Sequence, residues 1–246
     1  MLGSEKRQKI VLANLDGKAL VSSKTVLGEF IDTFVHDAVL FYNLVVDSPS
    51  IPEALKRLPN YRDRLTKRCI MIFANVAEEW GYVKEDFLDR LEVWIDWMLT
   101  YRFSQGLILL VEGTNCAKAR ANPMKENDRY VTPIPSLTCS QESPPECSVE
   151  AFIAAHKGDL INIIEKLRDL EQKDDNQKQM IAIGSRVANG EKKPIGRACQ
   201  CLKDIIIALE APGEGAIYTT NIKHFKPICA AIGKQLYKEK RSDSDN

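Results

Sequence analysis

The chain has no excess of charge of either sign and no long apolar run. Its 246 residues include 34 Lys and Arg and 34 Asp and Glu, which excludes the strongly basic bulk charge of many nucleic-acid-binding proteins but not a local basic groove. The longest compact apolar run, Ala38 to Val46, lies between two aspartates and is much shorter than the roughly 18 residues of a membrane span. We therefore expect a soluble protein with no membrane partner.

Secretion signals and metal-binding cysteine pairs are also lacking. No apolar segment of signal-peptide length follows the basic residues of the N-terminus, so we expect a cytoplasmic protein. The seven cysteines are an odd number at irregular spacing, which is typical of free thiols in a reducing compartment. Because no Cys-x-x-Cys pair occurs and the three histidines are scattered, we expect no zinc site.

The first hundred residues carry apolar side chains at helical spacing. The segments with this spacing are residues 25–47, 60–80 and 85–103. Ser22 or Ser23 is available to cap the first of them. We predict a mostly helical N-terminal region over residues 1–105, with a short strand at Ile10–Leu12 near its start.

After residue 105 strands alternate with helices. Leu107–Val111 is a continuous apolar run, typical of a strand covered on both faces. Ala216–Thr220 is a second such run, and we predict that both lie in one parallel sheet. The other segments are a proline-rich connection over 114–146, extended near 130–134, and helices over 148–170, 177–187, 202–211 and 225–232. The sequence thus predicts an α/β domain over residues 106–238 and a disordered tail over 239–246.

The stretch from Asp204 to Gly233 carries the pattern most informative about chemistry. Asp204 opens an apolar helix, a Pro-Gly turn leads to a short strand, and the strand ends on Thr219-Thr220-Asn221 before a Lys-x-Phe step. In a parallel α/β sheet, side chains at the carboxyl ends of strands and at facing helix ends converge on the crevice where ligands bind. We therefore expect Asp204 and Asn221 to face the same crevice.

This arrangement resembles the PIN domain, a nuclease fold. In that family an acidic residue starts the penultimate helix, and a Thr-x-Asn or Thr-x-Asp step ends the following strand. The resemblance is most specific over Asp204 to Phe225. It implies a PIN-like parallel sheet flanked by helices, with a carboxylate cluster that binds Mg²⁺ or Mn²⁺ and hydrolyses phosphodiesters, usually in RNA.

The resemblance also implies roles for individual residues. Asp204 takes the place of the helix-opening acid and Asn221 that of the polar residue at the strand end, while Glu112 follows the first strand and Glu150 lies about one helix later. These four are the expected catalytic residues. Glu112, Glu150 and Asp204 are the expected metal ligands, since hard divalent cations prefer oxygen. A competing assignment makes Asp16 the first acid, because Leu15–Val21 also resembles the family's opening strand.

Basic and polar residues flank the expected crevice and are expected to bind the substrate. They are Lys193, Arg197, Lys203, Thr220, Lys223 and His224. The implied function is a metal-dependent ribonuclease with RNA as its partner. Because His224 stands where the resemblance places a second Asp, and Asn221 is neutral, the alternative is a catalytically inactive PIN-like module for binding or regulation. A protein partner or a homo-oligomer is compatible with either function.

Overall fold

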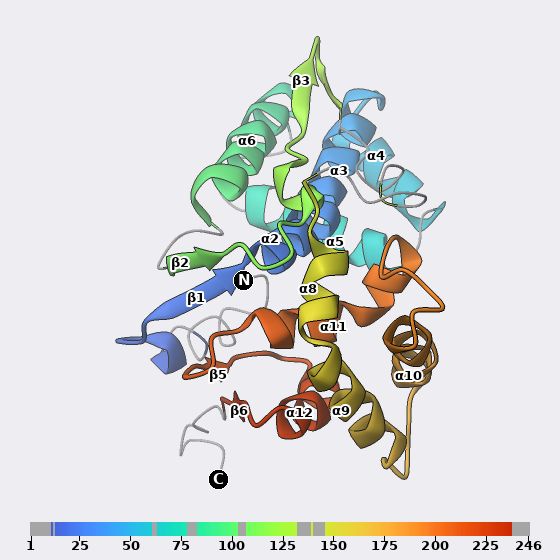
Figure 1. Ribbon diagram of the computed structural model, residues 1–246. Helices are drawn as coiled ribbons and strands as arrows, with labels where there is room; N and C mark the ends of the chain where they lie inside the picture. Colours follow the sequence, from blue (N-terminus) through green and yellow to red (C-terminus); the bar gives the residue numbers. More distant parts are fainter. Residues whose placement is uncertain are drawn as a thin grey trace, which may run out of the picture.

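The computed structural model describes residues 11, 13–60, 63–77, 83–102, 107–131, 139 and 146–237. Among these residues helices predominate, and the strands form three two-stranded sheets (Figure 1). Two of these sheets are parallel and one is antiparallel. The expected α/β class is therefore confirmed as a helix-rich fold with small parallel sheets.

The first half of the described chain consists mainly of helices. The hydroxyl of Ser23 accepts a hydrogen bond from the backbone N–H of Val26 at 3.3 Å and so caps the first predicted helix. Of the strand predicted at residues 10–12, only Val11 is described, and it is helical. The elements of this half are β1 (Leu20–Ser23), α2 (Lys24–Phe30), the π-helix η1 (Ile31–Val35), α3 (His36–Val46), α4 (Ile51–Arg57), η2 (Leu58–Asn60), α5 (Asp63–Ala77), α6 (Lys84–Trp97) and the π-helix η3 (Met98–Arg102).

These helices enclose a first apolar core. Phe41 of α3 packs edge-on against Phe87 of α6, with ring centroids 6.0 Å apart. Along α6 the buried side chains are Phe87, Leu91 and Ile95, and Met98 continues the series. The apolar stripe predicted over residues 85–103 is therefore confirmed as a core-facing helix surface.

A hairpin from later in the chain packs on the same core. β2 (Leu107–Val111) and η4 (Ala117–Arg120) precede β3 (Met124–Glu126) and β4 (Arg129–Val131). Tyr130 of β4 packs edge-on against Tyr42. Asn43 donates to the Tyr130 carbonyl at 2.8 Å and accepts from the Tyr130 N–H at 3.0 Å. The division of the chain at residue 105 stays a prediction, and this hairpin from beyond it belongs to the first core.

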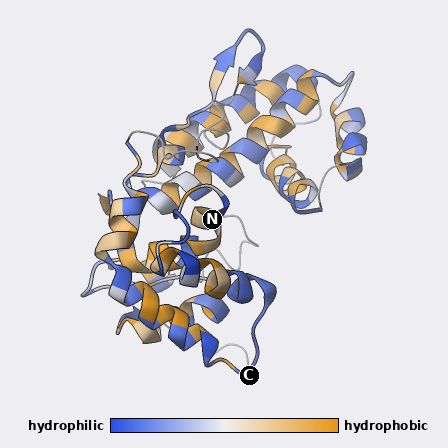
Figure 2. Ribbon diagram, turned by 45° about the vertical axis from the view of Figure 1, so that its right-hand side comes forward, coloured by the Kyte–Doolittle hydropathy of each residue, from blue (hydrophilic) through white to orange (hydrophobic). Residues whose placement is uncertain are grey.

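The second core lies among the helices that follow residue 148. The elements are α8 (Val149–Ala155), α9 (Lys157–Arg168), α10 (Asp175–Ala188), α11 (Arg197–Glu210), β5 (Ala216–Ile217), α12 (Ile222–Ala231) and β6 (Gln235–Leu236). α11 contacts α9, α10 and α12, and its Leu202, Ile205 and Ile206 are fully buried. In Figure 2 hydrophobic (orange) and hydrophilic (blue) residues alternate along the helices of both halves. This is the pattern of helices packed around an apolar core.

The prediction that Leu107–Val111 and Ala216–Thr220 share one parallel sheet is wrong. β2 is a strand as predicted, but it pairs in parallel with β1, with Ser23 opposite Val111. β5 covers only Ala216–Ile217 and pairs in parallel with β6, a strand that the sequence pattern did not predict. The partner of each run is thus a short strand distant in the sequence, which local periodicity does not reveal.

The expected covering of β2 on both faces is also wrong. Ile108 is 70% exposed and Leu109 is 55% exposed, although both belong to the continuous apolar run. A two-stranded sheet has little area for helices to cover, so an apolar strand within it can stay at the surface.

Three further sequence expectations concern membrane spans, the cysteines and the C-terminal tail. No helix among the described residues is long and apolar enough to cross a membrane. All seven cysteines are free. The tail predicted at residues 239–246 lies outside the described residues.

We expect Leu91→Ala to lower the free energy of unfolding by about 2–5 kcal/mol, because it leaves a cavity where the side chain is fully buried. Val93, two residues along the same helix, is 69% exposed, so Val93→Ala is expected to change stability by no more than about 0.5 kcal/mol. Urea unfolding of both variants measures the difference. Equal losses would contradict the assignment of this helix face to the core.

Candidate functional site

The structure brings Asp204, Asn221 and His224 together. Asp204 lies within α11, while Asn221 immediately precedes α12 and His224 lies in the first turn of α12. The Asn221 side-chain amide donates to Asp204 Oδ2 at 3.1 Å, and His224 Nδ1 lies 2.8 Å from the same oxygen. A direct hydrogen bond thus joins two of the residues that were expected to face one crevice.

Asp204 does not open its helix, contrary to the sequence prediction. α11 begins at Arg197, directly after Gly196, whose φ is 52°. A positive φ is readily adopted by glycine, so the chain changes direction there and the helix starts seven residues before Asp204. The carboxylate therefore projects from the body of the helix, with its side chain 13% exposed.

Asp174 completes the cluster, and the sequence analysis did not select it. Its carboxylate accepts a hydrogen bond from the Gln177 backbone N–H at 2.8 Å, while the Gln177 side chain accepts one from the Asp174 N–H at 3.1 Å. This capping box starts α10. Asp174 Oδ2 then faces His224 Nε2 at 3.1 Å and Lys223 Nζ at 3.0 Å. The Asp-x-x-Gln spacing before a helical pattern was the signal in the sequence.

Both ring nitrogens of His224 are placed to carry a proton. Each ring nitrogen faces a carboxylate oxygen, from Asp204 on one side and Asp174 on the other. An ionised carboxylate only accepts hydrogen bonds, so an imidazolium, which donates from both nitrogens, satisfies both contacts. The Asn221 amide nitrogen also lies 3.0 Å from Nδ1, and with an imidazolium it donates to Asp204 and not to the ring. Burial alone lowers the pKa of His224, but the hydrogen bonds and charges of Asp204 and Asp174 outweigh it and raise the pKa above 6.5.

The same contacts act on Asp174. The Gln177 backbone N–H, followed by Lys223 and His224, holds the pKa of this carboxyl well below its usual range, although burial opposes the shift. The two carboxylates, the imidazolium and the Lys223 ammonium carry balanced charges. The cluster is therefore a closed ionic network that joins α10, α11 and α12.

A polar cavity of about 290 Å³ lies beside this network. Among the expected substrate-binding residues, Arg197, Lys203 and His224 line it, and Asp204 lines it as well. Further lining residues are Asn176, Gln179, Met180, Gln200 and Cys201. Arg197 is exposed, whereas Lys203 forms an ion pair with Glu29 of α2.

Three other expected substrate-binding residues are not among those that line the cavity. Lys193 lies 3.5 Å from Glu150, and Lys223 pairs with Asp174. Thr220 is exposed between β5 and α12.

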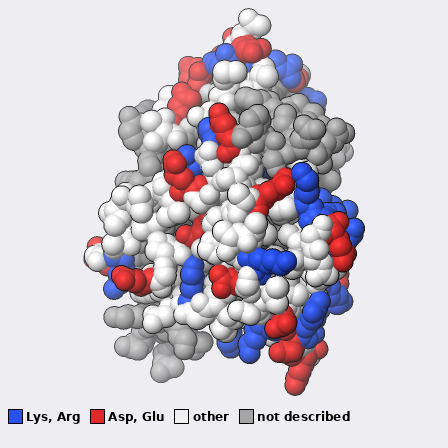
Figure 3. Space-filling model, viewed as in Figure 1, with Lys and Arg blue, Asp and Glu red and all other residues white. Residues whose placement is uncertain are grey.

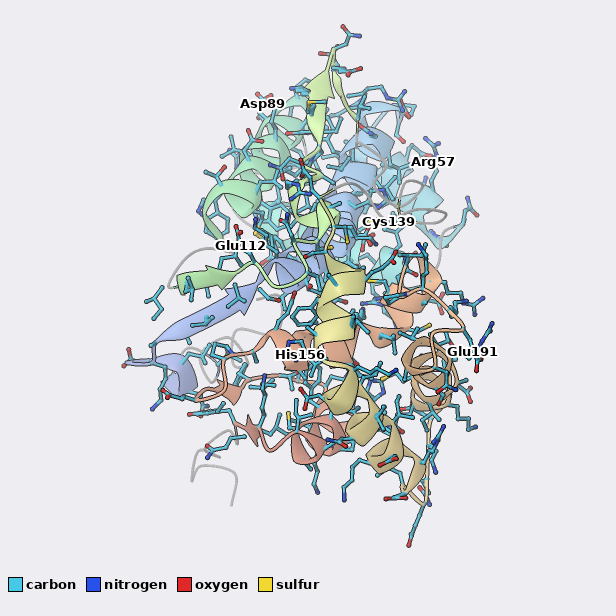
Figure 4. All side chains as sticks on the ribbon, viewed as in Figure 1. Arg57, Asp89, Glu112, Cys139, His156 and Glu191 are labelled. Carbon is cyan, nitrogen blue, oxygen red and sulfur yellow. The ribbon has the colours of Figure 1, made fainter. Side chains whose placement is uncertain are left out.

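The expected carboxylate cluster of Glu112, Glu150 and Asp204 is not formed. Glu112 follows β2 and pairs with Lys24 at 2.6 Å, with 74% of its side chain exposed. The Lys24 hydrogen bond and charge lower its pKa. Figure 4 shows Glu112 beside β2, and Glu150 lies in the first turn of α8. Within the described part of the chain, no three His, Cys, Asp or Glu side chains are placed to hold a metal ion.

The residues present therefore do not fit Mg²⁺ or Mn²⁺, which need several oxygen ligands. The physical reason is that β2 and β5 belong to separate sheets, so the residues that follow them do not share one edge. Oδ2 of Asp204 is also occupied by two donors. The competing first acid, Asp16, is exposed in the turn before β1.

No protein-family model matches the chain, and no curated protein and no solved structure matches it either.

We expect the stability of the protein to fall as pH rises above about 6.5. The pKa of folded His224 is raised above that value, so the imidazolium stabilises the fold fully below it and this stabilisation is lost as pH rises through the raised pKa. At a pH of about 6, His224→Gln should lower the free energy of unfolding by about 2 kcal/mol.

Denaturant unfolding at a series of pH values measures both effects. The pH dependence above about 6.5 should be weaker in His224→Gln than in the wild type. His156→Gln, which removes a histidine outside the network, is the control and should keep the dependence. An identical pH profile in His224→Gln and the wild type would refute the imidazolium assignment.

Proposed function

We propose that the chain is a PIN-like module that binds RNA and does not hydrolyse it. The observation that carries the proposal is the position of His224 between Asp204 and Asp174. In this arrangement the imidazolium takes the place beside the carboxylates that a divalent cation would need. The site is then suited to holding an anion nearby, not to activating water on a metal.

Features of the fold support the PIN-like part of the proposal. The chain has parallel strand pairs with helices around them, and Asp204 meets Asn221 at the start of the last helix, as the resemblance implies. The departures from the family pattern also lie together, because neutral Asn221 and basic His224 both contact the one acid. This grouping supports the inactive alternative over the ribonuclease.

The charge of the cavity supports RNA as the partner. Arg197 is exposed at the cavity and offers a planar fork of donors that matches phosphate oxygens. Lys203 lies beside it, and Figure 3 shows Lys and Arg side chains gathered near the segment that joins α10 to α11. Because His224 and Lys223 offset Asp204 and Asp174, a phosphate that approaches Arg197 meets no uncompensated acid in this network.

We expect Arg197→Gln to weaken the binding of labelled single-stranded RNA about tenfold. The slope of log affinity against log salt concentration should also become shallower, by the amount that corresponds to about one phosphate contact. Arg64→Gln, at an exposed position on α5 of the first core, is the matched control and should bind as the wild type does. Titrations at several salt concentrations measure both effects. Equal affinities of the two variants would contradict the placement of RNA at this cavity.

Incubation of the same RNA with the protein, in the presence of either Mn²⁺ or EDTA, tests whether the protein hydrolyses RNA. We expect the wild type and Asp204→Asn to leave the RNA intact in both conditions. Cleavage by the wild type that needs Mn²⁺ and disappears in Asp204→Asn would overturn the binding-module proposal in favour of the ribonuclease.

A further inference from the structure

A second polar cluster lies at the C-terminal end of α11 and is independent of the proposed function. Glu210, the last residue of α11, is only 5% exposed. A carboxylate at this position is unfavourable for two reasons. Burial removes its hydration, and the C-terminal end of a helix already carries partial negative charge.

One oxygen of Glu210 is well supplied with donors. Oε1 accepts from the Thr114 backbone N–H at 2.8 Å, and the hydroxyls of Thr25 and Thr114 lie 2.9 and 3.0 Å from it. Gly113 makes this approach feasible, because a Cβ there would lie 2.3 Å from Oε1. The residues that follow β1 and β2 thus form a cradle for one half of the carboxylate.

The other oxygen, Oε2, is buried and has no hydrogen-bond partner within the described part of the chain. A buried polar atom without a partner is unfavourable, and more so when it is charged. Groups of this kind in a native structure call for an explanation. A donor supplied by a ligand is one such explanation, provided that there is space for the ligand.

That space is a cavity of about 410 Å³ that Glu210 itself lines. It lies between the strand pairs β1–β2 and β5–β6, which Figure 1 shows one above the other. Its walls are largely apolar and include Leu20, Val26, Ile207 and Ile217. The volume is within the range of small-molecule sites, which combine apolar walls with a few polar groups.

We propose that this cavity binds a small molecule with one ammonium group on an apolar body. The ammonium pairs with the Glu210 carboxylate and neutralises its buried charge, while the body packs against the apolar walls. A divalent cation fits less well, because Glu210 is the only acid among the described residues that line the cavity. The exposed Lys18, which also lines it, disfavours a second positive charge on the ligand.

Phenethylamine, the isosteric phenethyl alcohol and phenylpropanoate are suitable probes for the full chain. We expect saturable binding of the amine, with a rise in melting temperature and a shift of the Thr114 amide signal in nuclear magnetic resonance spectra, because that N–H shares the carboxylate. The alcohol and the carboxylate should bind at least about tenfold more weakly, because neither brings a positive charge to the buried carboxylate.

Glu210→Gln should remove the preference for the amine over the alcohol, whereas Glu214→Gln, on the exposed loop that follows, should keep it. Should Glu210→Gln fail to fold, Ala19→Trp is the second test of the site. Ala19 lines the cavity at an exposed position, so a tryptophan there fills the cavity and leaves Glu210 unchanged. It should abolish amine binding. Equal affinities for amine and alcohol, no saturable amine binding, or an unchanged amine preference in folded Glu210→Gln would each overturn the proposal.

Discussion

The arrangement of the second half of the protein depends on one imidazolium held between two carboxylates. His224 brings the start of α12 against Asp204 of α11, and through Asp174 it also holds the first turn of α10. The imidazolium of His224 and the carboxylates of Asp204 and Asp174 depend on one another for a compensating charge. Without the histidine proton, two acids would lie partly buried with no cation between them, and Asp174 would keep only its helix cap and the exposed Lys223.

The ionic network also determines what chemistry the cavity beside it is suited to. One oxygen of the Asp204 carboxylate already accepts from an imidazolium and an amide, and the positive imidazolium beside it disfavours a divalent cation at the same place. The same contacts remove much of the repulsion that a phosphate would otherwise meet. Asn221 and His224 are the two residues that depart from the pattern of an active nuclease. Both departures are consistent with the proposed anion-binding role.

α11 carries a half-buried acid, Asp204, and a buried one, Glu210, with contrasting surroundings. Asp204 is compensated by a cation from α12, whereas Glu210 has donors on one oxygen only. The two are kept apart by apolar residues such as Ile205 and Ile206, which anchor the helix in the second core. A single helix thus serves a closed polar network near its middle and a cavity with an unmet hydrogen-bonding group at its end.

Local residue patterns were sufficient for most helices and for part of the site. The spacing of apolar residues predicted the helices because a helix buries one face at a fixed period, and the buried stripe on α6 shows the result. One helix, one turn and one short strand separate Asp204 from Asn221 in the sequence pattern. This was enough to predict that the two side chains lie near each other. The role of Asp174 as a helix cap could also have been predicted from its Asp-x-x-Gln spacing, but its contact with His224 could not.

Which distant segments meet was decided only by the tertiary structure. β1 pairs with β2 across the whole first group of helices, and the partner of β5 is a two-residue strand with no periodic signal. For this reason Glu112 and Glu150 are paired with nearby lysines and not with Asp204. The sequence by itself determined the helices and the short-range polar contacts, because those depend on local spacing. Strand pairing, and the burial of Glu210 that accompanies it, depend on contacts between residues far apart in the chain, which leave no periodic trace.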